Sequence, residues 1–226
     1  MVKTTLLFWF TTGFWFTRSS NFSTALNAAP AHSFSLLVQL ETLLEPLDLD
    51  RLFANPGPLQ VELGCGDASF LLEYARRNPG INFLGVERLM GRLQKLDKKG
   101  RRLELVNLRG LRIESAYFLQ YLLPAHRVSA IHIYFPDPWP KKKHRRNRLI
   151  QDGFPALIRR ALAPGGSVYL RTDDLDYFNQ MRAVFGGFDG CHEMETPPGL
   201  MEVTTDFERT FNARGVPTLR TAYRFS

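Results

Sequence analysis

Hydrophobic and polar residues follow two alternating periods along this chain. Short runs rich in β-branched and aromatic residues predict buried strands, and apolar residues spaced three and four apart predict helices that cover a sheet. The predicted strands are residues 59–63, 81–87, 103–108, 128–135, 167–172 and 219–225. The predicted helices are residues 67–78, 88–99, 115–123, 149–163 and 174–185. This alternation predicts an α/β fold with a mostly parallel sheet and helices on both faces.

Local signals set the expected ends of these elements. Asp67 and Asp174 are placed to cap the helices that follow them, and Gly100 is expected to end the second helix. The leucine-rich residues 36–53, which contain Pro46, predict one or two short helices before the first core strand.

Residues 1–35 differ from the rest of the chain. Lys3 precedes a phenylalanine- and tryptophan-rich run at residues 6–16, and a tract of small and polar residues follows it. This outline is typical of a signal peptide and is short for a membrane span, but no convincing cleavage site follows. Secretion therefore stands as the alternative to a disordered or spurious N-terminal extension, which we favour. Residues 36–226 are then expected to form one domain.

Composition and charge restrict the class of protein and the kind of ligand it can bind. The 226 residues suffice for one α/β domain with a full core. Cys65 and Cys191 provide neither a disulfide framework nor a metal-ligand cluster, which predicts a cytoplasmic protein without a bound metal. The net charge of +7 is uneven, because residues 88–102 and 141–148 each sum to +6 and the remainder sums to −5. Two cationic patches on a slightly acidic body indicate a binding site for a polyanion.

The most informative stretch is residues 134–148. Pro136, Pro138 and Pro140 restrict the backbone directly after a predicted strand, so Asp137 is expected to be held rigidly at that strand end. Six cations follow within eight residues. Taken separately, a proline turn and a solvated basic loop are ordinary features. Their adjacency at the carboxyl end of a strand, where open α/β sheets bind ligands, favours a functional site.

A second motif lies at the exit of the first core strand. Gly64 and Gly66 allow the backbone to approach a ligand closely, and Glu87 at the next strand end is placed to hold ribose hydroxyls. The third glycine of a dinucleotide loop is absent, which makes an NAD-dependent oxidoreductase a weaker alternative. Glu62, Glu87, Glu114 and Asp137 all follow or end strands, and this acidic edge suits a cationic nucleoside cofactor such as S-adenosylmethionine.

Several motifs together resemble the bacterial tRNA (guanine-N7-)-methyltransferase family. They are Val61–Gly66, Phe83–Glu87, Tyr134–Lys141, Arg171–Asp174 and Thr205–Glu208, and the similarity covers the chain from about Leu36 onward. The Phe-Pro-Asp-Pro-Trp stretch is the most specific of them.

The resemblance implies a Rossmann-like class I methyltransferase fold and the transfer of a methyl group from S-adenosyl-L-methionine to guanine N7. The implied target is position 46, in the variable loop of tRNA, and the implied catalytic residue is Asp137. Implied cofactor-binding residues are Glu62, Gly64, Gly66, Glu87, Glu114 and Asp137. Implied substrate-binding residues are Lys141, Asp173, Thr205, Asp206, Phe207 and Glu208. Implied RNA-contacting residues are Lys142, Lys143, His144, Arg145, Arg146 and Arg148.

The chain departs from the family pattern in two motif positions. Ala68 stands where many members have a glycine, and Glu114 stands where many have aspartate; Ala68 is expected to affect cofactor affinity more than the reaction. The principal alternative is a non-catalytic tRNA-binding protein that has lost donor binding. We expect tRNA as the macromolecular partner, no membrane association, and a monomer or weak homodimer.

Overall fold

The structure, a computed structural model, describes residues 34–226. The extension predicted for residues 1–35 lies outside the described residues except for Phe34 and Ser35, so it stays a prediction. The strands are β1 (Leu37–Val38), β2 (Leu59–Leu63), β3 (Asn82–Glu87), β4 (Leu108–Arg112), β5 (Val128–Tyr134), β6 (Leu162–Thr172), β7 (Cys191–Met194) and β8 (Leu219–Phe225). The helices are α1 (Ser69–Arg77), α2 (Met90–Arg102), α3 (Ser115–Tyr117), α4 (Phe154–Ala161), α5 (Leu175–Gly186), α6 (Pro198–Met201) and α7 (Asp206–Asn212). Shorter helical turns are η1 (Leu49–Arg51), η2 (Phe118–Leu122) and η3 (Lys142–Asn147). None of the described helices is long and apolar enough to cross a membrane.

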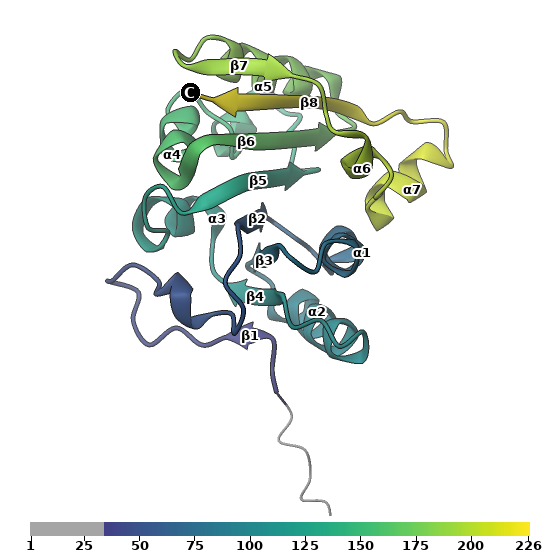
Figure 1. Cartoon of the computed structure of the whole chain (residues 1–226). Helices are drawn as coiled ribbons and strands as arrows, with labels where there is room; N and C mark the ends of the chain where they lie inside the picture. The colour runs from purple at the N-terminus through teal and green to yellow at the C-terminus, as the bar shows by residue number, and fades with distance from the viewer. Residues whose placement is uncertain (1–33) are drawn as a thin grey trace, which may run out of the picture. The chain divides into compact units, whose positions relative to one another are not determined.

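The strands form one sheet in the order β1-β4-β3-β2-β5-β6-β8-β7 (Figure 1). Strands β1 to β6 pair in parallel, and β8 lies antiparallel between β6 and β7. This arrangement confirms the mostly parallel α/β sheet. From β2 the chain first adds β3 and β4 on one side, and it later adds β5 and β6 on the other side. The loops after β2 and β5 therefore diverge, and a crevice forms at the carboxyl ends of these two strands.

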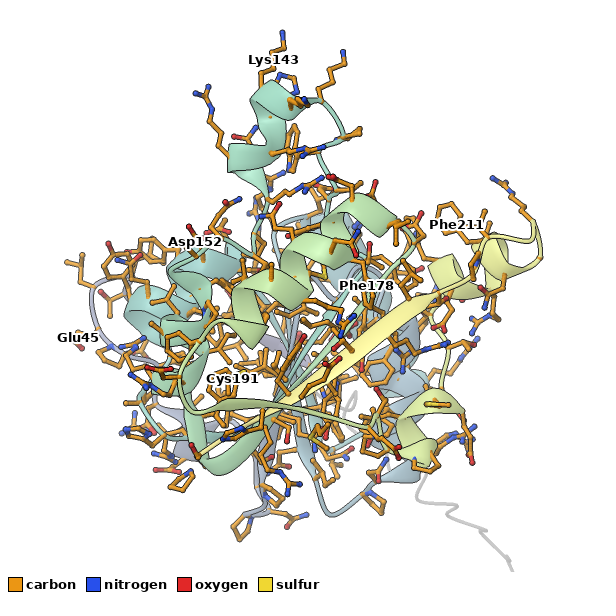
Figure 2. All side chains as sticks on the ribbon, turned by 90° about the horizontal axis from the view of Figure 1, so that it is seen from above. Glu45, Lys143, Asp152, Phe178, Cys191 and Phe211 are labelled. Atoms are coloured by element: carbon orange, nitrogen blue, oxygen red, sulfur yellow. The ribbon has the colours of Figure 1, made fainter. Side chains whose placement is uncertain are left out.

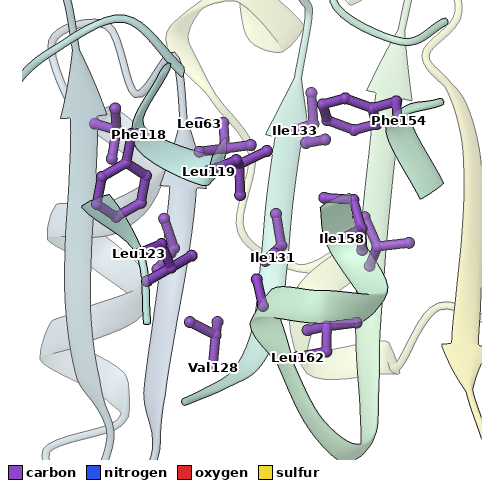
Figure 3. Packing of buried hydrophobic residues seen from close by; sticks show 14 of the residues in the cluster. Leu63, Phe118, Leu119, Leu123, Val128, Ile131, Ile133, Phe154, Ile158 and Leu162 are labelled. Atoms are coloured by element: carbon purple, nitrogen blue, oxygen red, sulfur yellow. The ribbon is translucent and has the colours of Figure 1, made fainter. Parts of the chain in front are cut away.

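Alternating side chains on the strands build two apolar layers. On one face, strand residues such as Ile131 pack with Leu119 of η2 and Ile158 of α4 (Figure 3). On the other face, Phe70 of α1 and Leu96 of α2 are buried against the sheet. Burial of one such side chain stabilises the fold by about 1.5–3 kcal/mol. Because successive strand residues point to opposite faces, the polar residues of β2 and β5 lie on the α1 face.

The predicted strand at residues 103–108 is wrong. Helix α2 continues to Arg102, a turn follows in which Glu104 has φ 54°, and the strand β4 begins only at Leu108. Gly100 does not end the helix but makes room for packing, since a Cβ there would lie 2.4 Å from Leu36 Cδ1.

Other element ends also differ from the predictions. Residues 36–53 contain one short helix, η1, as predicted, but their first part forms β1, because the carbonyl of Leu36 accepts from the amide of Gly110 of β4. Helix α4 begins at Phe154 and not at residue 149, since the amide of Ile150 donates to the Tyr177 hydroxyl, a tertiary bond.

The two predicted helix caps have different outcomes. Asp67 does not cap α1: the cap position is Ala68, which has φ 61° and no capping side chain. Asp174 does cap α5, because its Oδ1 accepts from the amide of Tyr177 at 2.7 Å.

Candidate active site at the carboxyl edge of the sheet

Acidic side chains lie at or just after the carboxyl ends of five adjacent strands. Their order across the sheet is Glu114 after β4, Glu87 at the end of β3, Glu62 in β2, Asp137 after β5 and Asp173 after β6. The parallel topology therefore brings together carboxylates that are more than a hundred residues apart in the sequence. The acidic edge predicted from the strand ends is present.

Two neighbouring cavities open at this edge. Cavity A, of about 480 Å³, has a lining that includes the predicted residues Glu62, Gly64, Gly66, Asp137, Asp173, Thr205, Asp206 and Phe207. Cavity B, of about 380 Å³, has a lining that includes the predicted residues Gly64, Glu87, Glu114 and Asp137. Gly64 and Asp137 belong to both linings, so the cavities share a wall made by the loops after β2 and β5.

The loop after β2 is shaped by its glycines and by Glu87. Gly64 and Gly66 have φ values of 75° and 57°, which favour glycine, and a Cβ on Gly64 would meet no atom within 4 Å. Gly64 lines both cavities, so its lack of a side chain leaves that space open. Glu87 accepts from the amide of Gly66 at 3.0 Å and from the amide of Leu89 at 2.8 Å, so this carboxylate fixes the loop. Ala68, at φ 61°, sits in a conformation that disfavours any side chain.

Glu62 is the least solvated carboxylate of the lining. It is 3% exposed, and its Oε2 has no hydrogen-bond partner among the described residues. Burial raises the pKa of Glu62 well above its ordinary value; the Arg171 guanidinium opposes this shift, and Asp67 and Glu87 add to it. A cationic ligand group beside Oε2 would supply both the missing partner and the compensating charge.

Tyr134, which lines both cavities, is held from behind by a buried polar network. His132 Nε2 donates to Gln60 Oε1 at 2.9 Å, and His132 Nδ1 accepts from the Tyr134 hydroxyl at 2.8 Å. Burial, aided by the Arg171 cation, lowers the pKa of His132 to about 3, so the imidazole is neutral and keeps this pattern. Arg171 also lies 4.2 Å from the Tyr134 ring centroid. The wall shared by the cavities is therefore rigid.

The Asp137 turn is joined to the basic loop by Arg148. The Arg148 side chain is 1% exposed, and its Nε donates to Pro138 O at 2.7 Å. Its other nitrogens donate to Gln180 Oε1 and Asp176 Oδ2 of α5, both at 2.6 Å. Arg145 also pairs with Asp176, at 3.0 Å. The basic loop is thus anchored at its base. Figure 2 shows that its tip at Lys143 projects from the domain.

Some predicted contact residues lie away from both cavities. Glu208 was predicted to bind substrate, but it is fully buried, pairs with Arg171 and Arg220, and completes the capping box of α7 with Thr205. Arg148 was predicted to contact RNA, and its guanidinium is likewise inside the protein. We therefore assign structural roles to both residues. The remaining residues outside the cavity linings are Lys141, Lys142, Lys143, His144, Arg145 and Arg146, and they form the loop surface beside the site.

The cavities also contain residues that were not predicted as site residues. Arg92 lines both cavities and lies 3.6 Å from Glu87, and Lys95 lines cavity A. Both belong to the cationic patch of residues 88–102, and that patch was the sequence signal for them. Phe135 and Phe211 also line cavity A, and an apolar residue next to a turn gives no sequence signal of that role.

Taken together, the edge offers a glycine loop, buried and exposed carboxylates and aromatic walls. These features suit a nucleoside-like ligand with a cationic portion better than a pyrophosphate, which the carboxylates would repel. Within residues 34–226, no group of three His, Cys, Asp or Glu side chains is arranged to hold a metal ion.

Comparison with known sequences gives consistent matches. A family model described as "Putative methyltransferase" matches residues 56–221. The chain is 36% identical over 157 residues to a tRNA (guanine-N(7)-)-methyltransferase of Geobacter metallireducens, which covers 70% of this chain and 74% of that protein. It is 35% identical over 188 residues to the enzyme of that name from Rubrobacter xylanophilus, covering 80% of this chain and 81% of that protein.

Comparison with solved structures supports the fold. The 16S rRNA methyltransferase KamB superposes with a TM-score of 0.55 at 16% identity, covering 80% of this chain and 95% of that one. TrmN from Thermus thermophilus superposes with a TM-score of 0.53 at 17% identity, covering 76% of this chain and 45% of that one.

Proposed function

The chain belongs to the family of tRNA (guanine-N(7)-)-methyltransferases, and we propose that it methylates N7 of the guanine at position 46 of tRNA, in the variable loop. The methyl donor is S-adenosyl-L-methionine, and the protein is an enzyme of the class I methyltransferase fold.

One observation carries the donor assignment beyond family membership. Glu62 is buried beside the glycine loop with an unpartnered Oε2, and S-adenosylmethionine has an ammonium group and a sulfonium that fit this need. We propose that Glu62, Gly64 and Gly66 hold the methionine end in cavity A. Glu87 and Glu114, in cavity B, would hold the nucleoside end through its hydroxyl and amino groups.

The reaction requires no proton transfer to or from the protein. S-adenosylmethionine supplies an electrophilic methyl group; the guanine N7 lone pair forms the new C–N bond while the C–S bond breaks, and the sulfur becomes a neutral thioether. No proton leaves, but the guanine ring gains a positive charge. Asp137 is exposed on the wall shared by both cavities, where a carboxylate can stabilise that charge and accept from the N1–H and N2–H₂ groups of guanine. We propose it as the catalytic residue and not as a proton acceptor.

The surface around the site can hold RNA. Lys141 to Arg146 lie beside the Asp137 turn, and Arg92 and Lys95 line cavity A. Phosphate contacts from such side chains position an RNA without reading its sequence. We propose that these two groups flank the phosphates near the target guanine, with Asp173, Thr205 and Asp206 contacting its nucleoside.

The remaining assignments are also proposals. We infer that the protein acts in the cytoplasm, where tRNA and donor occur, that residues 36–226 suffice for activity, and that it acts as a monomer or weak homodimer.

The test is incubation of the protein with an unmodified tRNA transcript and methyl-labelled donor, followed by nucleoside analysis. We expect labelled 7-methylguanosine, and no label in a matched transcript with adenosine at position 46. A protein that binds tRNA but neither binds nor consumes the donor would support the non-catalytic alternative instead.

A further inference from the structure

Three phenylalanines from two distant segments form a stack on the wall of cavity A. The ring centroids of Phe135 and Phe207 are 6.3 Å apart with planes 22° from parallel, and those of Phe207 and Phe211 are 5.8 Å apart at 28°. All three line cavity A together with Asp137. Phe207 is 56% exposed, so part of its ring is accessible from the cavity. Figure 2 shows Phe211 on α7, at the margin of the domain.

The two segments are fixed to each other through one residue. The carbonyl of Arg171 accepts from the amide of Phe135 at 2.8 Å, and the Arg171 side chain pairs with Glu208 at 2.9 Å, one residue after Phe207. The amide of Asp206 also donates to Ser69 Oγ at 2.9 Å, which ties the start of α7 to the start of α1. The segments that carry the exposed ring are therefore held in place by buried hydrogen bonds and an ion pair.

The surroundings of the stack select the kind of ligand. An aromatic face carries partial negative charge and attracts cations and electron-poor rings. Asp137, Asp173 and Asp206 line the same cavity, and together with the phenylalanine faces they favour a flat group that carries positive charge or N–H donors. A guanine that is being methylated at N7 has all three properties.

We propose that Phe207, supported by Phe135 and Phe211, stacks on the target guanine after it has left the stacking of the RNA, and that this contact strengthens as methylation makes the ring cationic. This inference rests on the proposed function. Enzymes that enclose a target base in a pocket remove it from its stack, and an aromatic surface replaces part of the lost stacking. Because the attraction grows with the charge on the ring, the stack stabilises the transition state more than the bound substrate.

The first test compares Phe207→Leu with Phe207→Tyr. Leucine keeps the apolar contact but removes the aromatic face, so we expect kcat/KM for tRNA to fall about tenfold or more, whereas tyrosine should retain most of the activity. Because Phe207 is exposed, neither change should alter the melting temperature appreciably. Phe34→Leu is the matched control: Phe34 is 58% exposed and lines neither cavity, so this variant should keep the parental activity.

The second test measures the preference for charge. We expect 7-methylguanosine to inhibit the parent protein more strongly than guanosine does, and we expect Phe207→Leu to reduce that preference while the affinity for the donor is unchanged. Parental kcat/KM in Phe207→Leu, or an unchanged preference for 7-methylguanosine, would overturn the stacking inference while the proposed function stands. Failure of the parent protein to form 7-methylguanosine in tRNA would overturn both.

Discussion

Replacing Arg148 tests whether this residue anchors the Asp137 turn or contacts RNA. Arg148→Met keeps the length of the side chain and removes its donors to Pro138 O and Gln180 Oε1. Each charge-assisted bond contributes about 1.5–3 kcal/mol, so the two together contribute about 3–6 kcal/mol. We count nothing for Asp176, which is half-exposed. For a domain of this size, each kcal/mol corresponds to about 2–4 °C, so the melting temperature should fall by at least about 6 °C.

The kinetic consequence follows from the position of Pro138, directly after Asp137. A displacement of about 1 Å at a reacting group can lower the rate about 10²-fold, so we expect kcat at saturating tRNA to fall by that order while tRNA affinity changes little. Arg148→Lys keeps the charge but not the planar fork of donors, and it should restore only part of the rate. The matched control is Arg146→Met, an exposed neighbour, which should weaken tRNA binding and reduce its salt dependence at an unchanged melting temperature.

The assays are thermal unfolding, single-turnover methylation below the melting transition, and tRNA binding at several salt concentrations. If Arg148→Met behaved like Arg146→Met, with weaker binding, normal stability and normal kcat, Arg148 would be an RNA contact and the anchoring argument would be refuted.

Three further changes test the site. Asp137→Asn should lower kcat about 10²-fold with tRNA affinity nearly intact, since it removes the charge and keeps the shape; equal losses of rate and affinity in filter binding would contradict a catalytic role. Because the pKa of Glu62 is raised, the folded protein keeps a proton on this carboxyl group at pH values where the unfolded chain has released it. The free energy of unfolding should therefore fall as the pH rises above 4.5, the ordinary pKa of the group. Denaturant titrations at several pH values should show this dependence in the parent protein and not in Glu62→Gln. Because Ala68 has φ 61°, Ala68→Val should destabilise the protein by more than about 2 kcal/mol, whereas Ala68→Gly should change its stability by no more than about 1 kcal/mol. Similar unfolding midpoints for the two variants would refute the strain argument.

Much of the fold and site could be predicted because the relevant signals are local. Strand periodicity and the turn residues after β2 and β5 placed Glu62, Glu87 and Asp137 at one sheet edge, and the parallel topology then brought them together. The glycine loop could be predicted because its chemistry is carried by adjacent residues.

The remaining features depend on contacts that no local pattern encodes. Gly100 looks like a helix end, but it is glycine because Leu36 packs against it. Arg148 belongs by sequence to a basic run, yet its partners on α5 draw it inside the protein. Glu208 likewise matches a substrate motif but is buried by pairing with Arg171. In each case a partner distant in sequence decides the role.

Strand β1 sets how far the chain can be shortened from its amino end. Its two residues cover the β4 edge, and the amide of Leu36 donates to Asp97 of α2 at 2.7 Å. A cut before Phe34 leaves this seal intact. Truncation beyond Val38 would expose the edge of β4 and the space next to Gly100. Exposed strand edges of this kind can pair with strands of other molecules. A few residues that never approach the cavities therefore decide whether a trimmed enzyme stays dispersed or aggregates.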